Sequence, residues 1–434
     1  MRRPRLRAFV LLLSLGCGMP ALPALAHPPA YDGAASVARI DKARLDATLA
    51  AQVDQAGLVG VSALVWQDGR EAYFGAFGMA DREQGRPMAR DTLVQIFSMT
   101  KPVTGVALMQ LYERGLFQLD DPLEKYLPEF AGIRLYAGTD VKGQPLLVAP
   151  RRPPSVRDVL RHTAGFVSGS GEPGPVGDLY RATGPENFDH TLEQEVRKLA
   201  SVPLLYEPGT RWLYSPAVDV QARLVEVLSG LPFEQYLQQH VFGPLKMKDT
   251  RYALRKADWS RVAALYLRSD DGLMTRIPAA EAFKLNGRDT ALKPGSWGLV
   301  STLDDYMRFA RMLLNGGELD GARILQPATV RLMGSDALPS QVTDTSWLKG
   351  KGQMGFGIDF AVRVAPPASA GEPSGEVGEF FWDGAANTLF WVDPVNRITA
   401  VLFAQYLPPG RGNLHKAFRD TVYHEDSSAA APRP

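Results

Sequence analysis

The chain has almost no cysteine: Cys17 is the one thiol in 434 residues, and it lies close to the N-terminus. If the N-terminal segment through Ala26 is removed, no disulfide can form, and thiol catalysis and cysteine-based metal sites are excluded. Histidine is also scarce, with six residues and no His-Glu-x-x-His or other metal-ligand spacing. We therefore expect no metal site.

Other absences narrow the chemistry further. The chain has no Gly-x-Ser-x-Gly elbow, so a Ser-His-Asp hydrolase lacks its local signature. It has no phosphate-binding loop and no dinucleotide fingerprint, and we expect no cofactor. Lys and Arg (48) nearly balance Asp and Glu (47), which gives a net charge of +1 and no reason to expect a nucleic-acid partner.

The N-terminal segment has the pattern of a secretory signal. A basic head (Arg2, Arg3, Arg5 and Arg7) precedes the apolar run 8–16 and the small-residue site Ala24-Leu25-Ala26. We expect residues 1–26 to be a signal peptide and the mature protein to be periplasmic or secreted. The alternative is a lipid anchor on Cys17. No later segment reaches the roughly 20 apolar residues of a membrane helix.

A serine and a lysine, Ser98 and Lys101, stand three residues apart before the apolar run 103–112. On a helix such residues are neighbours, and Pro102 suits a first helical turn. An amine beside a serine hydroxyl is typical of covalent acyl transfer. The pattern alone is weak, because Ser346-Trp-Leu-Lys349 matches it in what we expect to be a loop. The alternative for Ser98 is a helix-capping residue.

A general base that works near neutral pH needs a lowered pKa, because the ordinary pKa values of Lys (~10.4) and Tyr (~10) are too high. Burial of Lys101 would lower its pKa, or a charged Lys101 would favour a neighbouring phenolate. Tyr214 is the candidate tyrosine, since it follows a Pro-Gly turn and precedes a predicted helix. The alternative for Tyr214 is that it is an aromatic residue packed at a loop–helix junction. His162 lies at the end of a predicted helix, and we expect it to have a structural role.

The segment Trp382-Asp383-Gly384-Ala385 has two readings. Asp-Gly between apolar runs can be a hairpin turn. Alternatively, Gly384 allows the backbone to approach the reacting carbonyl, and the N–H groups of Ala385 and Ser98 form an oxyanion hole.

Strand-like segments occur at both ends of the chain and helical ones between them. We predict strands near 59–66 and 71–77, joined at Gln67-Asp68-Gly69, and further strands at 355–364, 378–382, 388–392 and 398–405. Helices are predicted at 42–56, 155–161, 193–200, 218–229, 233–242, 303–314 and 413–423, and Gly115 is predicted to cap the helix that follows Ser98. One α/β domain would combine 27–119 with 285–425, a mostly helical domain would span 120–284, and 426–434 would be a disordered tail.

In order along the chain, several segments resemble serine hydrolases of the class C β-lactamase-like group, which belongs to the penicillin-binding-protein-like superfamily, and especially its family VIII carboxylesterases. They are Ser98–Lys101, Leu160–Gly165, Glu207–Gly209, Tyr214–Val220, Phe242–Thr250, Gly298–Tyr306, Leu314–Glu318 and Trp382–Gly384. The resemblance implies an α+β fold, an antiparallel sheet flanked by helices plus a mostly helical domain. It also implies that Ser98 is the acylated nucleophile and that Lys101 and Tyr214 share the role of general base. The backbone N–H groups of Ser98 and Ala385 would bind the oxyanion.

Two departures concern the substrate. The β-lactamases of this group show Tyr-x-Asn and a site-lining Lys-Thr-Gly, where this chain has Pro216 and Trp382-Asp383-Gly384. Trp382 cannot form a salt bridge and Asp383 adds a negative charge, so we expect small neutral carboxylic esters as substrates. The segment Lys293-Pro294-Gly295-Ser296 is discounted as a substitute, because proline is unfavourable in a central strand. The alternatives are a β-lactamase, D-amino-acid peptidase or amidase with the same machinery, and a non-catalytic penicillin-binding-like module.

Overall fold

The computed structural model describes residues 40–423 apart from 170, 186, 343–347 and 349–350. The expectations for the signal peptide, for Ser346 and Lys349, and for the C-terminal tail fall outside these residues. Within the described part of the chain, no helix is long and apolar enough to cross a membrane.

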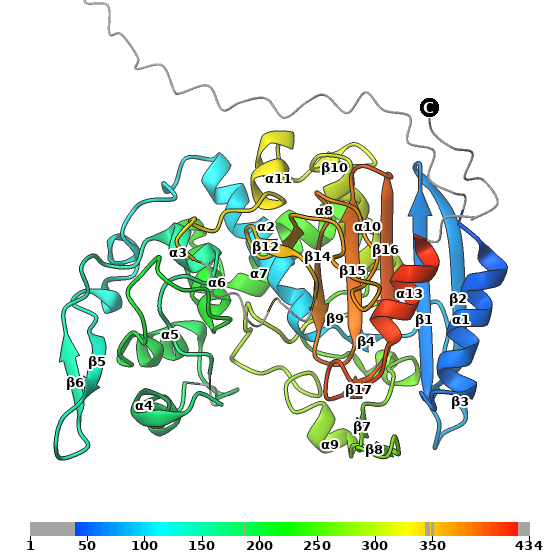
Figure 1. Cartoon of the computed structure of the whole chain (residues 1–434), viewed down its shortest axis with the longest axis horizontal. Helices are drawn as coiled ribbons and strands as arrows, with labels where there is room; N and C mark the ends of the chain where they lie inside the picture. The colour runs from blue at the N-terminus through cyan, green and yellow to red at the C-terminus, as the bar shows by residue number, and fades with distance from the viewer. Residues whose placement is uncertain (1–39, 170, 186, 343–347, 349–350, 424–434) are drawn as a thin grey trace, which may run out of the picture. The chain divides into compact units, whose positions relative to one another are not determined.

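An eight-stranded antiparallel sheet with the order β12-β13-β14-β15-β16-β1-β2-β3 forms the centre of the fold (Figure 1). Its strands are β1 (Gly60–Gln67), β2 (Arg70–Asp81), β3 (Arg86–Pro87), β12 (Met354–Phe356), β13 (Ala361–Arg363), β14 (Phe380–Gly384), β15 (Thr388–Asp393) and β16 (Ile398–Phe403). Strand β1 pairs with β16 from Ser62 opposite Phe403 to Gln67 opposite Ile398. The two ends of the chain therefore share one sheet, as the sequence predicts.

The hairpin β1–β2 turns at Asp68 and Gly69, between the paired residues Gln67 and Arg70. Both turn residues have positive φ, 52° and 76°, which is the backbone that a two-residue hairpin loop requires. Strand β1 is buried along nearly its whole length, because a central strand covered on both faces carries apolar residues without alternation.

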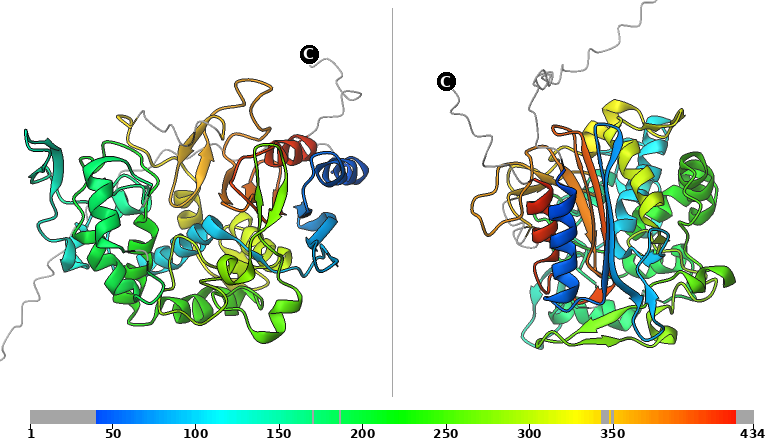
Figure 2. Two further views of the ribbon diagram at one scale, coloured as in Figure 1. Left: turned by 90° about the horizontal axis from the view of Figure 1, so that it is seen from below. Right: turned by 90° about the vertical axis from the view of Figure 1, so that its right-hand side faces the viewer.

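Helices cover both faces of the sheet. On one face α1 (Lys42–Asp54) and α13 (Leu414–Val422) lie side by side, joined by a 3.0 Å hydrogen bond between the hydroxyls of Thr48 and Thr421. On the other face lie α2 (Thr100–Glu113) and α10 (Leu303–Leu314). Figure 2 shows the blue and red helices on one side of the strands and the cyan and yellow helices on the other.

The segment between these halves is mostly helical. Its helices are α3 (Val156–Leu160), α4 (Gly174–Thr183), α5 (Leu192–Ala200), α6 (Ala217–Ser229), α7 (Phe233–Leu237), α8 (Gly243–Leu245) and α9 (Ala279–Ala282). It also holds two short hairpins, β5 (Leu135–Thr139) with β6 (Pro145–Val148), and β7 (Tyr266–Arg268) with β8 (Met274–Arg276). Helix α6 packs on α2. The domain boundaries at 119/120 and 284/285 stay predictions.

Other strands and one other α-helix of the described residues are short. They are β4 (Val94–Gln95) with β9 (Val300–Ser301), β10 (Glu318–Leu319) with β11 (Ala322–Arg323), α11 (Pro327–Met333) and β17 (Tyr406–Leu407). The prediction of a single strand at 355–364 is wrong. This segment is the hairpin of β12 and β13, because Asp359 turns the chain with φ of 57°.

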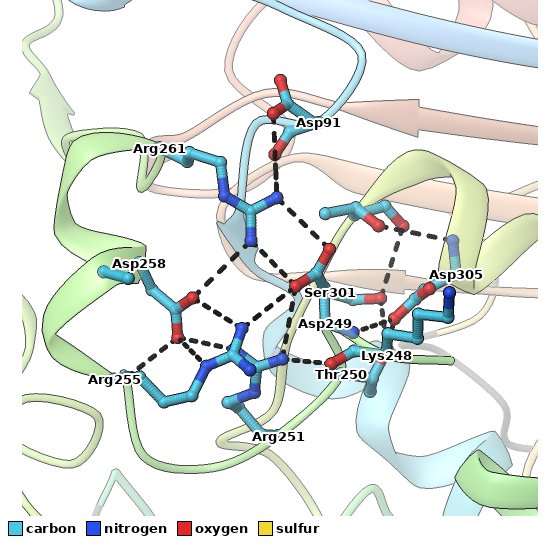
Figure 3. A network of polar contacts seen from close by, with 12 residues as sticks. Asp91, Lys248, Asp249, Thr250, Arg251, Arg255, Asp258, Arg261, Ser301 and Asp305 are labelled. Carbon is cyan, nitrogen blue, oxygen red and sulfur yellow. Dashed lines mark hydrogen bonds and ion pairs between the residues drawn. The ribbon is translucent and has the colours of Figure 1, made fainter. Parts of the chain in front are cut away.

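A network of charged side chains fastens the segment after α8 to the sheet domain (Figure 3). Three arginines, Arg251, Arg255 and Arg261, surround the carboxylates of Asp249 and Asp258. Asp305 in α10 accepts the N–H of Asp249 at 2.7 Å. The next residue, Tyr306, donates its hydroxyl to the carbonyl of Met99 at 2.7 Å. The network therefore anchors the helix that holds the Ser98 segment.

Candidate active site

Ser98 lies in a short 3-10 turn, η1 (Phe97–Met99), which runs directly into α2. Phe97 adopts the left-handed backbone with φ of 45°, an unfavourable conformation for a bulky residue that surrounding structure must hold in place. Lys101 stands one turn further on, with Nζ 3.3 Å from Ser98 Oγ. Gly115 follows α2 with φ of 72°, so the predicted cap is confirmed.

The Lys101 side chain is buried and fixed. The residue is 4% exposed, and its Nζ donates a 2.6 Å hydrogen bond to the carbonyl of Ser296. Burial lowers the pKa of Lys101 to about 8, although the carboxylates of Asp219, Asp359 and Asp383 act in the opposite direction. At neutral pH Lys101 is still mostly protonated, but far more of it is an uncharged amine that can accept a proton than an ordinary lysine would provide, and this share grows as the pH rises toward 8.

Tyr214 reaches the same serine from the loop before α6. Its hydroxyl donates to Ser98 Oγ at 2.8 Å, and Lys101 Nζ lies 4.5 Å from the centre of its ring. Burial raises the pKa of Tyr214 well above its ordinary value, and the hydrogen bond with Ser98 opposes this only in part. Tyr214 therefore keeps its proton in the free protein.

His162 packs against the ring of Tyr214. It is 1% exposed, and its ring centre lies 5.0 Å from that of Tyr214. Its Nδ1 accepts the N–H of Ser215 at 3.3 Å. Burial, assisted by the charge of Lys101, lowers the pKa of His162 well below 6.5, so the ring is neutral. This environment agrees with the expected structural role.

Gly384 brings β14 against the backbone that precedes Ser98. A Cβ at this position would lie 2.4 Å from the carbonyl oxygen of Ile96 and 2.2 Å from Thr388 Oγ1, so only glycine fits. The hairpin-turn reading of Asp383-Gly384 is wrong, since both residues are paired in β14 and the loop follows at Ala385–Asn387. Because Gly384 approaches so closely, Ala385 lies at the same cavity as Ser98.

That cavity has a volume of about 510 Å³. Ser98, Tyr214, Gly384 and Ala385 line it, together with Lys351, Phe381, Asp383, Asn387, Leu389 and residues of the 371–373, 409–412 and 413–419 segments. Trp382 does not line it. This side chain is 1% exposed and packs on Tyr214, with ring centres 5.5 Å apart.

Sequence reasoning missed two contributions to the site. Ser296, in the discounted Lys293–Ser296 segment, holds Lys101 through its carbonyl. Lys351 forms an ion pair with Asp383 inside the cavity. Asp383, expected from the sequence to add a negative charge, therefore has a compensating cation in the cavity. No pattern in the sequence connects Lys351 with Asp383, because they lie 32 residues apart in separate loops and strands.

Comparison with known proteins shows which family the chain belongs to. Residues 45–423 match the Beta-lactamase family. Esterase EstB of Burkholderia gladioli is 31% identical over 400 residues, which cover 88% of this chain and 95% of that protein. An uncharacterized protein of Mycobacterium tuberculosis (strain CDC 1551 / Oshkosh) is 33% identical over 362 residues, 82% of this chain and 88% of its own length.

A solved structure gives the same result. EstCE1, described as a hydrolase with promiscuous acyltransferase activity, superposes with a TM-score of 0.71 at 29% identity, covering 88% of this chain and 98% of that one. The expected α+β fold, an antiparallel sheet flanked by helices, is thereby confirmed. The chain belongs to the β-lactamase family and is a serine hydrolase of that fold.

Proposed function

We propose that Ser98 is the nucleophile of an enzyme that hydrolyses carboxylic esters through an acyl-serine intermediate. One observation carries the assignment: Ser98 Oγ lies 3.3 Å from Lys101 Nζ and 2.8 Å from the Tyr214 hydroxyl, at the wall of a cavity. A hydroxyl within hydrogen-bond reach of a base, with a second proton carrier beside it, is the arrangement that nucleophilic catalysis requires.

In the acylation step, Ser98 Oγ attacks the ester carbonyl carbon while its proton moves to the neutral Nζ of Lys101. The carbonyl oxygen becomes an oxyanion, and the backbone N–H groups of Ser98 and Ala385 are our candidates for binding it. The bond to the alcohol oxygen then breaks. That oxygen takes the proton of Tyr214, and Tyr214 is reprotonated by Lys101.

Deacylation reverses these transfers with water in place of the alcohol. Water loses a proton to the Tyr214–Lys101 pair and attacks the acyl carbon. The Ser98 ester bond then breaks, and Ser98 Oγ regains a proton. The raised pKa of Tyr214 keeps it protonated, so it can donate a proton to the leaving alcohol. The lowered pKa of Lys101 makes its neutral amine available to accept the proton of Ser98 or of water.

Ester substrates are favoured over amides and lactams by the likeness to Esterase EstB. The test is hydrolysis of short-chain p-nitrophenyl esters by the wild type, by Ser98→Ala and by Ser346→Ala, which alters the second Ser-x-x-Lys match. We expect turnover by the wild type and Ser346→Ala, and a loss of at least about a thousandfold in Ser98→Ala.

Intact-mass spectrometry separates the alternatives. A fluorophosphonate adduct on Ser98 is expected, and its absence in folded protein would point to a non-catalytic penicillin-binding-like module. Rapid acylation and release of penicillin without ester turnover would instead favour a β-lactamase, peptidase or amidase.

We also propose that the protein is exported, on the basis of the basic head, apolar run and Ala24-Leu25-Ala26 site. Expression in a bacterial host followed by N-terminal mass analysis should give a periplasmic chain that begins at His27. A chain that retains Met1 in the cytoplasm would contradict this, and a lipid-modified Cys17 would show the anchored alternative.

A further inference from the structure

The charges on the wall of the catalytic cavity are unequal in sign. Three cationic side chains, Lys351, Lys416 and Arg419, line the cavity, and Asp383 is the one carboxylate among the lining residues that the structure describes. Asp383 forms its ion pair with Lys351. Lys351 and Asp383 therefore compensate each other, and Lys416 and Arg419 leave an excess of cationic side chains on the wall.

The acidic partners of the other two cations lie outside the cavity wall. Lys416 pairs with Asp420, and Arg419 pairs with the fully buried Glu379. Neither acid lines the cavity among the described residues. Both cations belong to α13, whose first turn also lines the cavity, and the N-terminal end of a helix carries partial positive charge. These groups together make the part of the cavity wall formed by α13 favourable for an anion.

Lys351 is held on the same cavity wall by its ion pair with Asp383. Its side chain is 17% exposed and that of Asp383 is 20% exposed, so both remain accessible from the cavity. Its Nζ also lies 5.5 Å from the centre of the Trp382 ring, which places the cation over an aromatic face. The cavity that Ser98 lines thus also contains an ammonium, supplied by a loop outside the sheet.

We propose that Lys351 is a specificity-determining residue that selects esters carrying a carboxylate away from the scissile bond. This inference rests on the proposed ester hydrolysis. An ammonium donates up to three hydrogen bonds, so it can contact a substrate carboxylate while Asp383 keeps it in position. The substrate anion would then extend toward Lys416 and Arg419, whereas the neutral scissile carbonyl stays at Ser98.

Two matched substrate pairs test the proposal and show which part of the ester carries the charge. Phenyl hexanoate and monophenyl adipate differ by a carboxylate on the acyl side, and phenyl acetate and 4-acetoxybenzoate differ by one on the alcohol side. The measured quantity is the ratio of kcat/KM for the anionic ester to that for the neutral ester. Comparing this ratio between variants cancels the intrinsic reactivity of each ester.

Lys351→Met keeps the length of the side chain and removes its charge. For at least one pair we expect the ratio to fall by about tenfold to a hundredfold, the usual effect of losing a hydrogen bond to a charged group. The matched control is Lys125→Met, which removes a lysine paired with Asp121 on the surface and should leave the ratio unchanged. Thermal unfolding confirms that both variants are folded.

Asp383→Asn gives an independent test in the opposite direction. It removes the carboxylate that competes for Lys351, so the ratio should rise, chiefly through a lower KM for the anionic ester. If both esters of each pair are hydrolysed and neither variant changes the ratio for either pair, the inference is overturned, whereas the proposed ester hydrolysis still holds. Failure of the wild type to hydrolyse any of the four esters would overturn the proposed function and this inference together.

Discussion

Lys101 donates a 2.6 Å hydrogen bond to the backbone carbonyl of Ser296, and this contact fixes the direction of the amine. Ser296 is itself held by Asp219, which accepts the Ser296 N–H at 2.9 Å and the Ser296 hydroxyl at 2.7 and 2.8 Å. Asp219 is 3% exposed and lies in the first turn of α6. A chain of contacts therefore runs from α6 through Ser296 to the base.

The charge of Asp219 should be visible in the pH dependence of kcat/KM. Burial is the largest influence on the Lys101 pKa, which is lowered to about 8, and Asp219 opposes this effect. Since protonated Lys101 cannot accept the Ser98 proton, wild-type activity should fall as the pH drops below about 8. Asp219→Asn keeps the shape of the side chain and removes its charge. The acidic limb should then move to lower pH, by a few tenths of a unit to about one unit.

The measurement is kcat/KM from about pH 6 to 10 with a neutral ester. Asp270→Asn, which removes the charge of a 94% exposed side chain, is the comparison variant and should leave the limb in place. A limb that moves upward in Asp219→Asn, or one that does not move at all, would rule out this electrostatic role.

Tyr214→Phe should reduce kcat by about a hundredfold to ten-thousandfold, the range for loss of a general acid–base group. The hydrogen bond to Ser98 Oγ is lost, but the ring contacts with His162, Trp212 and Trp382 remain. The melting temperature should therefore change little. Tyr136→Phe, on the exposed β5–β6 hairpin, is the control, and steady-state kinetics with melting curves provide the readout. Wild-type kcat in Tyr214→Phe would remove this residue from the mechanism.

Gly384→Ala should impair both stability and activity. The added Cβ would lie 2.4 Å from the Ile96 carbonyl oxygen, and a backbone atom cannot rotate away. We expect a loss of about 1–3 kcal/mol in the free energy of unfolding and a lower kcat/KM, because β14 must shift from the Ser98 segment. Gly171→Ala is the control, since its Cβ meets nothing within 4 Å. Urea unfolding and ester kinetics measure the two effects, and a fully active, equally stable Gly384→Ala would contradict the close approach.

The network in Figure 3 should make stability depend on pH in the acid range. Burial alone would raise the pKa of Asp258, but hydrogen bonds from Arg255 and Arg251 outweigh it, and the net pKa is lowered. Since the folded-state pKa lies below the unfolded value of about 3.9, the stabilisation is complete above that pH. It is lost as the pH falls through the folded-state value.

Asp258→Asn should therefore lower the free energy of unfolding at neutral pH by about 1–3 kcal/mol and flatten the decline of stability below about pH 4. Circular dichroism melts at neutral and acidic pH measure this, with Asp270→Asn as control because Asp270 has a 94% exposed side chain. Equal acid sensitivity in the wild type and in Asp258→Asn would show that other carboxylates dominate.

Local patterns in the sequence predict much of the framework. The Asp68-Gly69 hairpin, the Gly115 cap and the amphipathic helix 303–314 each depend on residues a few positions apart. A single strand at 355–364 is wrong because Asp359 turns the chain, and nothing in its neighbours signals the left-handed backbone. The turn reading of Asp383-Gly384 is wrong for a related reason, since β14 continues through both residues.

By itself the sequence identified the candidate nucleophile Ser98 and its candidate partners Lys101 and Tyr214, because the apolar helix after Ser98 and the ordered segments of the family resemblance separate this pair from the Ser346–Lys349 match. Only the tertiary structure decided what surrounds them. It set the Lys101 pKa through burial, turned Trp382 toward Tyr214 and paired Asp383 with Lys351. Burial and ion pairing depend on segments distant along the chain, and the charge of the cavity became known only when folding brought those segments together.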